Sequence, residues 1–243
     1  MRITVVEHEA EAGLGFFAGW LAGAGARCET ARPYLGEPVP ETPADGLVVL
    51  GGAASSWDDE GYPWLPATRD LIRRGVRDGV PTLGLCLGAQ LMTLACGGRV
   101  ERGGNGLEVG LCPVLPLPAA ATDPLFRHVP GVPGGAAPAA VQYHRDAMTV
   151  LPAGAVPLVT GHAYPNQAYR LGESAWALQF HPEATPEIFV SWTADGADPL
   201  TAAGYHVDEL NAQVKLAAEE LARTWRPLAE AFAGVVADRR KNL

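Results

Sequence analysis

Short apolar runs alternate with helix-length amphipathic segments through the first half of the chain. This pattern predicts strands over residues 3–7, 47–50 and 82–85, and helices over residues 14–24, 65–77 and 87–95. Strands that alternate with helices are typical of a parallel sheet with helices on both faces. We therefore expect an α/β fold with a doubly wound, mostly parallel central sheet. In such a fold, sites form beyond the carboxyl ends of the strands.

The second half of the chain has more strand character and ends in a helical pattern. Residues 167–171 and 175–180 flank a Gly-Glu-Ser turn, which predicts a hairpin. Residues 119–138, rich in Ala, Pro and Gly, predict a surface excursion. Apolar residues at helical spacing then predict a long amphipathic helix packed on the core, through Val207, Leu210, Val214, Ala218, Leu221, Trp225, Leu228 and Phe232. We expect one domain over residues 1–243, with residues 190–243 as a C-terminal helical extension.

A cysteine stands where a predicted strand meets a predicted helix. Cys86 follows the strand over residues 82–85 and precedes the helix over residues 87–95, and Gly84 and Gly88 flank it. Glycines at these places let the backbone turn sharply, so the spacing predicts a nucleophile elbow. The positive end of the helix dipole would favour the thiolate, which is the nucleophilic form.

A histidine and a carboxylate follow the last predicted strand. Residues two apart on a strand point to the same face, so His181 and Glu183 are expected to lie side by side, with the carboxylate orienting the imidazole. Pro182 has no N–H and would end strand pairing there. The plainer interpretation is a surface histidine beside an acid. The cysteine elbow elsewhere in the chain favours a catalytic base.

Composition narrows the class of protein. The formal charge of −9 over 243 residues argues against a nucleic-acid-binding surface, and Arg239-Arg240-Lys241 is expected to be a solvated helix end. Four cysteines without repeated spacing fit neither a disulfide framework nor a zinc site, which favours a reducing cytoplasm and no metal. The first residues lack the apolar run of a signal peptide, and no stretch has membrane-spanning length.

The alternative role for a cysteine is a buried structural one. This interpretation suits Cys28, Cys96 and Cys112, but at Cys86 it leaves the two flanking glycines unexplained.

Several motifs together resemble the class I glutamine amidotransferase family, in the branch similar to the amidotransferase domain of GMP synthetase. They are the Cys86 elbow, Gln90 and His181-Pro182-Glu183, with further similarity at residues 47–52, 62–65, 108–110 and 142–152. The resemblance covers most of residues 1–190. It implies a flavodoxin-like fold, a triad of Cys86, His181 and Glu183, and glutaminase-type chemistry on a γ-carboxamide without a metal or organic cofactor.

Two backbone N–H groups are candidates for the oxyanion hole. The N–H of Leu87 follows the nucleophile in the elbow, and Gly51-Gly52 lets the neighbouring loop bring the N–H of Gly52 close. An ordinary tight turn would also explain the two glycines. Ala53 stands where members of the family usually carry a proline, which bears on the rigidity of this loop.

Three further residues are expected to contact the substrate. Gln90 lies one helical turn beyond Cys86, and in the family this glutamine touches the amino-acid end of the substrate. Tyr143 and His144 resemble the segment that lines the far wall of the pocket, and by family precedent His144 is a lining residue and not the base. Arg145 stands where many relatives have glycine, so it either reshapes the pocket or points to solvent.

Several functions fit these residues. The first is a free-standing hydrolase that cuts a γ-glutamyl amide through a Cys86 thioester, and the altered pocket at Ala53 and Arg145 favours it. The second is a glutaminase subunit that delivers ammonia to a separate synthetase, and the third is a non-catalytic binding module of the same fold. An α/β-hydrolase would normally place its acid before the histidine, unlike Glu183. We expect a small-molecule substrate, glutamine or a γ-glutamyl compound, with a synthetase partner or a homo-oligomer as options and neither nucleic acid nor membrane as a partner.

Overall fold

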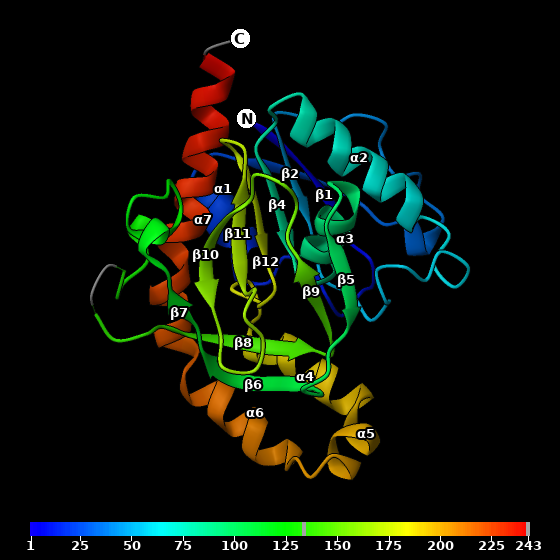
Figure 1. Cartoon of the computed structure of the whole chain (residues 1–243), viewed down its shortest axis with the longest axis vertical. Helices are drawn as coiled ribbons and strands as arrows, with labels where there is room; N and C mark the ends of the chain where they lie inside the picture. The colour runs from blue at the N-terminus through cyan, green and yellow to red at the C-terminus, as the bar shows by residue number, and fades with distance from the viewer. Residues whose placement is uncertain (133–134, 242–243) are drawn as a thin grey trace.

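A mixed sheet forms the centre of the molecule in the computed structural model, which describes residues 1–132 and 135–241 (Figure 1). In spatial order its eight strands are β2 (Arg27–Ala31), β1 (Arg2–Val6), β3 (Gly46–Val49), β4 (Thr82–Leu85), β12 (Ala175–Leu178), β11 (Ala168–Leu171), β10 (Val156–Thr160) and β7 (Leu115–Pro116). The strands from β2 to β12 are parallel, and β11, β10 and β7 extend the sheet in antiparallel fashion. The predicted fold class is confirmed.

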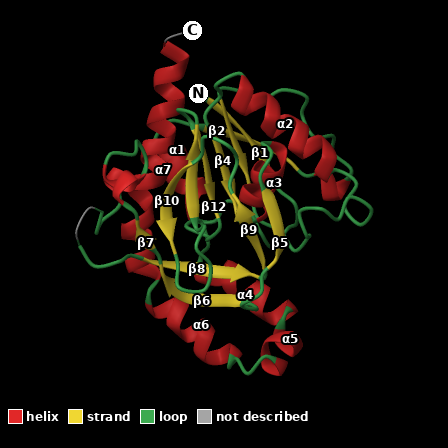
Figure 2. Ribbon diagram, viewed as in Figure 1, coloured by secondary structure: helices red, strands yellow, loops and turns green. Residues whose placement is uncertain are grey.

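Helices cover both faces of the parallel strands (Figure 2). One face packs against α1 (Phe16–Gly23) and α7 (Ala218–Lys241), and the other against α2 (Leu65–Arg77) and α3 (Leu87–Ala95). Successive strand residues point to opposite faces, so Val48 enters the first of these cores and Val49 the second. Burial on both faces explains why these strands are short continuous apolar runs in the sequence.

Two small antiparallel sheets border the main one. They pair β5 (Arg99–Arg102) with β9 (Asp146–Val150), and β6 (Glu108–Pro113) with β8 (Ala139–His144). Figure 1 shows β6 and β8 crossing the lower end of the main sheet. A bridge between Val141 and His181 joins β8 to the segment that follows β12. This end of the sheet is therefore enclosed by strands that the hydrophobic pattern did not predict.

The C-terminal region is helical but divided. Its helices are α4 (Pro186–Asp195), α5 (Ala197–Ala202), α6 (Val207–Leu216) and α7. The predicted apolar stripe does face the core through Val214, Leu221, Trp225, Leu228 and Phe232. The prediction of one long helix is wrong, because α6 ends at Leu216, with Ala217 as its C-cap, and α7 begins at Ala218. The helix α6 packs on β6 while α7 packs on α1, so one straight helix could not cover both surfaces.

The expected surface excursion over residues 119–138 is corrected by the structure. Ala120, Leu125 and Phe126 are buried in the main core, and short 3-10 turns form at Pro118–Ala121 and Phe126–His128. The buried Asp123 accepts hydrogen bonds from the backbone N–H groups of Leu125 and Phe126. The composition rich in Ala, Pro and Gly gave no hydrophobic pattern from which these few core side chains could be predicted. Residues 133–134 of this segment lie outside the described residues.

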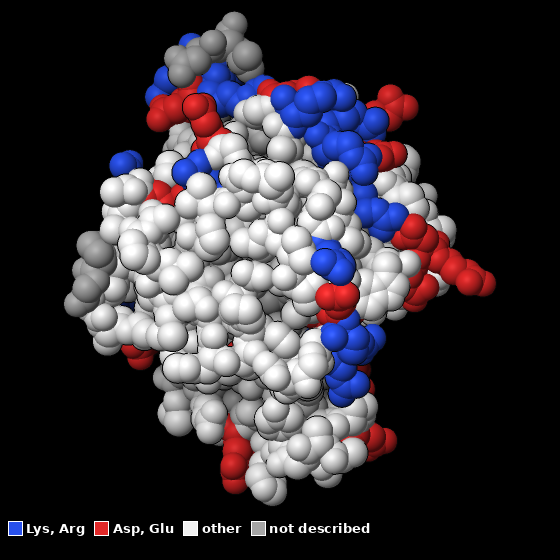
Figure 3. Space-filling model, viewed as in Figure 1, with Lys and Arg blue, Asp and Glu red and all other residues white. Residues whose placement is uncertain are grey.

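Figure 3 shows basic side chains gathered over α2, with acidic groups at the edge of this cluster. Arg69 pairs with Asp59, and Arg77 pairs with Asp78. Neighbouring carboxylates thus offset the basic side chains of this helix. No helix among the described residues is both long and apolar enough to cross a bilayer.

The cysteines differ from expectation in their burial. Cys28, Cys96 and Cys112 are each only partly buried, whereas Cys86 is buried, and none of these four forms a disulfide. The interpretation of the first three as buried structural cysteines is therefore corrected: their strands and helix end lie at the margins of the core.

Candidate active site

The backbone at Cys86 forms a strained turn between β4 and α3. Its φ of 48° and ψ of −105° make it the one non-glycine residue with positive φ in the described part of the chain. A β-carbon on Gly84 would lie 2.6 Å from the carbonyl oxygen of Gly88, and one on Gly88 would overlap the carbonyl oxygen of Val49. Both flanking positions therefore require glycine, so that α3 can lie close to β3 and β4.

His181 and Glu183 contact one another beside this turn. The Nδ1 atom of His181 lies 2.7 Å from Oε1 of Glu183, and both side chains are buried. The strand prediction was too long here, because β12 ends at Leu178 and His181 lies three residues later. A hydrogen bond from the His181 N–H to the carbonyl of Val141, at 2.9 Å, fixes the histidine. The bond to strand β8, and not the alternation of side chains along β12, therefore holds His181 in place.

The charge on His181 depends on two opposing effects. Burial disfavours the imidazolium, but the Glu183 carboxylate and the Cys86 sulfur outweigh it and raise the pKa of His181 to about 10. Glu183 occupies Nδ1, which leaves the other ring nitrogen for the hydrogen bond to Cys86. The ring of Trp192 lies 4.5 Å from the His181 ring, centroid to centroid, and limits its rotation. His181 is therefore held as a proton donor next to a sulfur nucleophile.

A cavity of about 400 Å³ opens above these groups. Of the residues predicted from the sequence, six line it: Gly52, Cys86, Gln90, Tyr143, His144 and His181. Glu183 lies behind His181, and Leu87 begins α3 directly after the nucleophile. The structure thus brings the predicted side chains to one cavity.

The two candidate oxyanion donors are free to bind. Among the described residues, the N–H groups of Leu87 and Gly52 have no protein acceptor. A β-carbon on Gly51 would lie 2.8 Å from Cε1 of His181. Gly51 therefore serves a close approach of the loop to His181, which an ordinary turn would not need.

A pair of glutamine amides connects Cys86 to the pocket wall. The side-chain nitrogen of Gln90 donates to the carbonyl of Asp146 at 3.0 Å and to Oε1 of Gln179 at 3.3 Å, and the nitrogen of Gln179 lies 3.6 Å from the Cys86 sulfur. The nitrogen of Gln90 is thus used internally, and its oxygen has no donor among the described residues. Sequence reasoning missed Gln179, although it lies two positions before His181.

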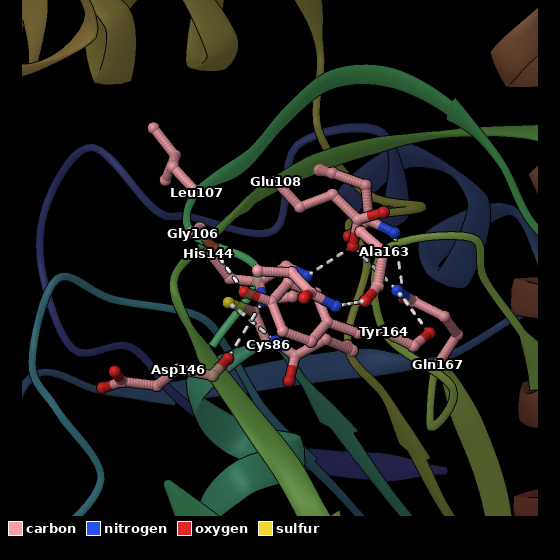
Figure 4. A network of polar contacts seen from close by, with 12 residues as sticks. Cys86, Gly106, Leu107, Glu108, His144, Asp146, Ala163, Tyr164 and Gln167 are labelled. Atoms are coloured by element: carbon pink, nitrogen blue, oxygen red, sulfur yellow. Dashed lines mark hydrogen bonds and ion pairs between the residues drawn. The ribbon is translucent and has the colours of Figure 1, made fainter. Parts of the chain in front are cut away.

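A second histidine–carboxylate pair supports the same wall (Figure 4). Nε2 of His144 lies 2.9 Å from Oε2 of Glu108, which also accepts a hydrogen bond from Gln167 at 2.8 Å. Nδ1 of His144 carries a proton, because its partner at 3.0 Å is the carbonyl of Asp146. The predicted lining residue His144 thus has a buried acid partner, 36 positions away in the sequence, that no local pattern could reveal.

Tyr143 and Arg145 border the mouth of the cavity. Tyr143 is half-buried and packs near Trp192, with ring centroids 6.1 Å apart. Arg145 is exposed, as one of the two expectations for it has it, and it also lines the cavity. No cluster of three or more His, Cys, Asp or Glu side chains suited to a metal occurs in residues 1–132 and 135–241.

Comparisons with known proteins bear on the family of this chain. Residues 26–195 match the family "Glutamine amidotransferase class-I". The glutamine amidotransferase-like protein YfeJ of Salmonella typhimurium is 29% identical over 192 residues, which are 77% of each chain. The GMP synthase of Lactococcus lactis is 32% identical over 144 residues, 59% of this chain but only 25% of that enzyme.

Solved structures show the same fold. A glutamine amidotransferase from Methylobacillus flagellatus superposes with a TM-score of 0.82 at 25% identity and matches 97% of this chain and 94% of its own. One from Thermotoga maritima has a TM-score of 0.81 at 24% identity over 96% of this chain and 98% of its own.

Proposed function

The chain belongs to the class I glutamine amidotransferase family, and we propose that it hydrolyses a γ-glutamyl amide through a thioester on Cys86. The observation that carries this proposal is the strained Cys86 elbow facing the buried His181–Glu183 pair inside one cavity. The same carboxylate–imidazole–sulfur order is the general arrangement of an activated cysteine nucleophile.

The first half of the reaction forms the thioester. The Cys86 thiolate attacks the γ-carbonyl carbon, and the oxygen that becomes negative is bound by the N–H groups of Leu87 and Gly52. The C–N bond then breaks, and the departing amine takes the proton held by His181. Glu183 keeps the imidazole oriented during the transfer. Gln179 supports the sulfur through its amide N–H.

The second half releases the acid. His181, now neutral, takes a proton from water, and the resulting hydroxide attacks the thioester carbonyl at the same oxyanion site. The C–S bond breaks, which restores the Cys86 thiolate and a protonated His181. The net reaction consumes one amide and one water, and yields glutamate and an amine, or ammonia when the substrate is glutamine.

The amino-acid end of the substrate is assigned to the wall formed by Gln90, Tyr143 and His144. The unengaged oxygen of Gln90 suits the substrate ammonium, and the fixed ring of His144 holds the carbonyl of Asp146 that orients Gln90. The exposed Arg145 lines the mouth of the cavity, through which a substituted amine would leave.

A second candidate is a glutaminase subunit whose ammonia passes to a synthetase. The similarity to GMP synthase favours it, since this chain aligns with 25% of that enzyme. The two candidates differ in whether the purified chain is active alone.

The test measures kcat/KM for glutamine and for a series of γ-glutamyl amines, with the purified chain and with Cys86→Ala. A clear preference for a substituted amide, abolished in the variant, supports the hydrolase. Negligible turnover of every substrate, restored by an added synthetase, would favour the subunit. Full turnover by Cys86→Ala would overturn the mechanism.

A further inference from the structure

The loop that carries the proposed oxyanion donor Gly52 has an anchor on each side. This oxyanion loop, defined as residues 51–55, follows β3 and lies between the segment after β1 and the start of β9. A loop N–H stabilises a developing charge only if it is held in place beforehand. Its anchors therefore bear on the rate of the reaction.

On one side the loop rests on residues that follow β1. The N–H of Ala53 donates to Oε2 of Glu9 at 3.0 Å. A β-carbon on Gly52 would lie 2.9 Å from Cβ of His8, so His8 lies directly against the loop. The buried His8 is itself fixed, because Nε1 of Trp64 donates to its Nδ1 at 3.0 Å.

On the other side the loop is tied to β9. The hydroxyl of Ser55 donates to Oδ2 of Asp146 at 2.7 Å, and Nε of Arg102 lies 2.8 Å from Oδ1 of the same carboxylate. Ala53 directly follows the two glycines. Among the described residues, its N–H is the only backbone group that donates to the Glu9 carboxylate. A proline at position 53 would lack this hydrogen.

We propose that Glu9 is a positioning residue that holds the oxyanion loop through the Ala53 N–H. The N–H of Gly52 is then in place to bind the oxyanion that forms when Cys86 attacks the substrate. This inference rests on the proposed function. Glu9 lines the cavity but its bonded oxygen faces the loop. Burial and the nearby Glu11 and Asp195 raise the pKa of Glu9, while the Ala53 N–H and His181 oppose this rise.

Two other roles for Glu9 predict different kinetics. As a charge near His181 it would act through its ionisation, and as a substrate ligand it would act through binding. Positioning requires only an acceptor oxygen, which glutamine also provides. Correct positioning of the loop stabilises the transition state more than the bound substrate. Its loss therefore lowers kcat and leaves KM nearly unchanged.

The experiment compares Glu9→Ala, Glu9→Gln and Glu11→Ala in steady-state hydrolysis. We expect Glu9→Ala to lower kcat about 10- to 100-fold with KM changed less than about twofold, since a displaced donor costs less than a deleted one. Glu9→Gln is expected to keep kcat within about threefold of wild type. Glu11→Ala removes a neighbouring carboxylate with no bond to the loop and is expected to lower kcat less than Glu9→Ala does.

A double-mutant cycle isolates the bond itself. If Glu9 acts through the Ala53 N–H, Glu9→Ala has no further effect on kcat in the Ala53→Pro background, because that hydrogen is already absent. Amide hydrogen exchange at Ala53 supplies a readout independent of turnover, and we expect it to accelerate in Glu9→Ala and not in Glu9→Gln.

Three results would overturn the inference. They are equal losses of kcat in Glu9→Ala and Glu9→Gln, a rise in KM at constant kcat, and unchanged exchange at Ala53 in Glu9→Ala. If wild type showed no Cys86-dependent hydrolysis, the proposed function would fail, while the exchange measurement would still test whether Glu9 holds the loop.

Discussion

At the scale of single residues, Cys86 differs from Cys28, Cys96 and Cys112 in its strained backbone and in the surroundings of its thiol. A non-glycine residue at positive φ costs about 1–3 kcal/mol and persists only where its surroundings enforce it. Here the Cys86 N–H bonds to the carbonyl of Leu178 at 2.8 Å and the flanking glycines allow the turn. The sulfur is thereby aimed into the cavity beside a protonated imidazole.

This difference predicts selective alkylation. Burial raises the pKa of the Cys28 and Cys96 thiols, and burial together with Glu108 raises that of Cys112 to about 11, so these three remain protonated at neutral pH. A γ-glutamyl chloroketone is therefore expected to modify Cys86 and no other cysteine. Peptide mass mapping of the labelled protein decides it, with Cys86→Ala as the unlabelled control. Label found chiefly at another cysteine would mean that the reactive thiol is misassigned.

The raised pKa of His181 predicts a dependence of stability on pH. Its value in the folded protein is about 10, above the ordinary 6.5, so the imidazolium is bound more tightly in the folded state. The contribution of this group to the free energy of unfolding is complete below pH 6.5 and is lost as the pH rises towards about 10. Urea unfolding of wild type and His181→Gln between pH 6 and about 10 measures the contribution of His181 to the free energy of unfolding. The gap in stability between the two is expected to narrow over this interval; a constant gap would contradict the prediction.

Site residues could be predicted from the sequence where their partners lie close to them in the chain. Cys86 with its glycines and His181 with Glu183 form local spacings, and the sequence located them. Glu9 and Ala53, 44 positions apart, meet only in the fold. The same holds for Glu108 and His144, and for Gln90 and Gln179, 89 positions apart.

At the scale of elements, β4, α3 and β12 form the frame of the site. The helix-length segments predicted over residues 65–77 and 87–95 are α2 and α3, with the same bounds in the structure. The pairs β5–β9 and β6–β8 escaped prediction because short strands with mixed burial give little alternation. The buried segment near Phe126 escaped because its few core residues are separated by Ala and Pro.

The contact between α3 and β3 predicts a large effect for Gly88→Ala. The added β-carbon would overlap the carbonyl oxygen of Val49, and both are backbone or backbone-attached atoms that cannot rotate away. We expect a loss of unfolding free energy of about 1–3 kcal/mol or more, with loss of hydrolysis. Gly19→Ala in α1 is the matched control, since nothing lies within 4 Å of its added β-carbon, and it is expected to stabilise by about 0.5–1 kcal/mol. Equal effects in urea titration would contradict the proposed close packing.

At the scale of the whole molecule, the C-terminal helices are joined to the sheet by shared core. The helix α7 contributes Trp225, Leu228 and Phe232 to the same cluster as Val5 of β1 and Phe17 of α1. Nε1 of Trp225 also donates to the carbonyl of Ala139 on β8 at 3.0 Å. The helix ends are suited to the dipole, with Glu219 and Glu220 in the first turn of α7 and Arg239, Arg240 and Lys241 in the last.

We therefore propose that residues 1–243 unfold as one domain, including the helical extension. Because α7 and β1 share a core, neither can lose its packing without exposing the other, and cooperative unfolding follows. Scanning calorimetry is expected to give one transition whose calorimetric and van't Hoff enthalpies agree. Phe232→Ala opens a cavity at the centre of this shared core and should lower the midpoint of the whole transition, at a cost of about 3–5 kcal/mol. The exposed Glu230→Ala in the same helix is the control, with an expected change within about 0.5 kcal/mol. Two resolved transitions, with Phe232→Ala shifting only one of them, would show that the extension is a separate unit.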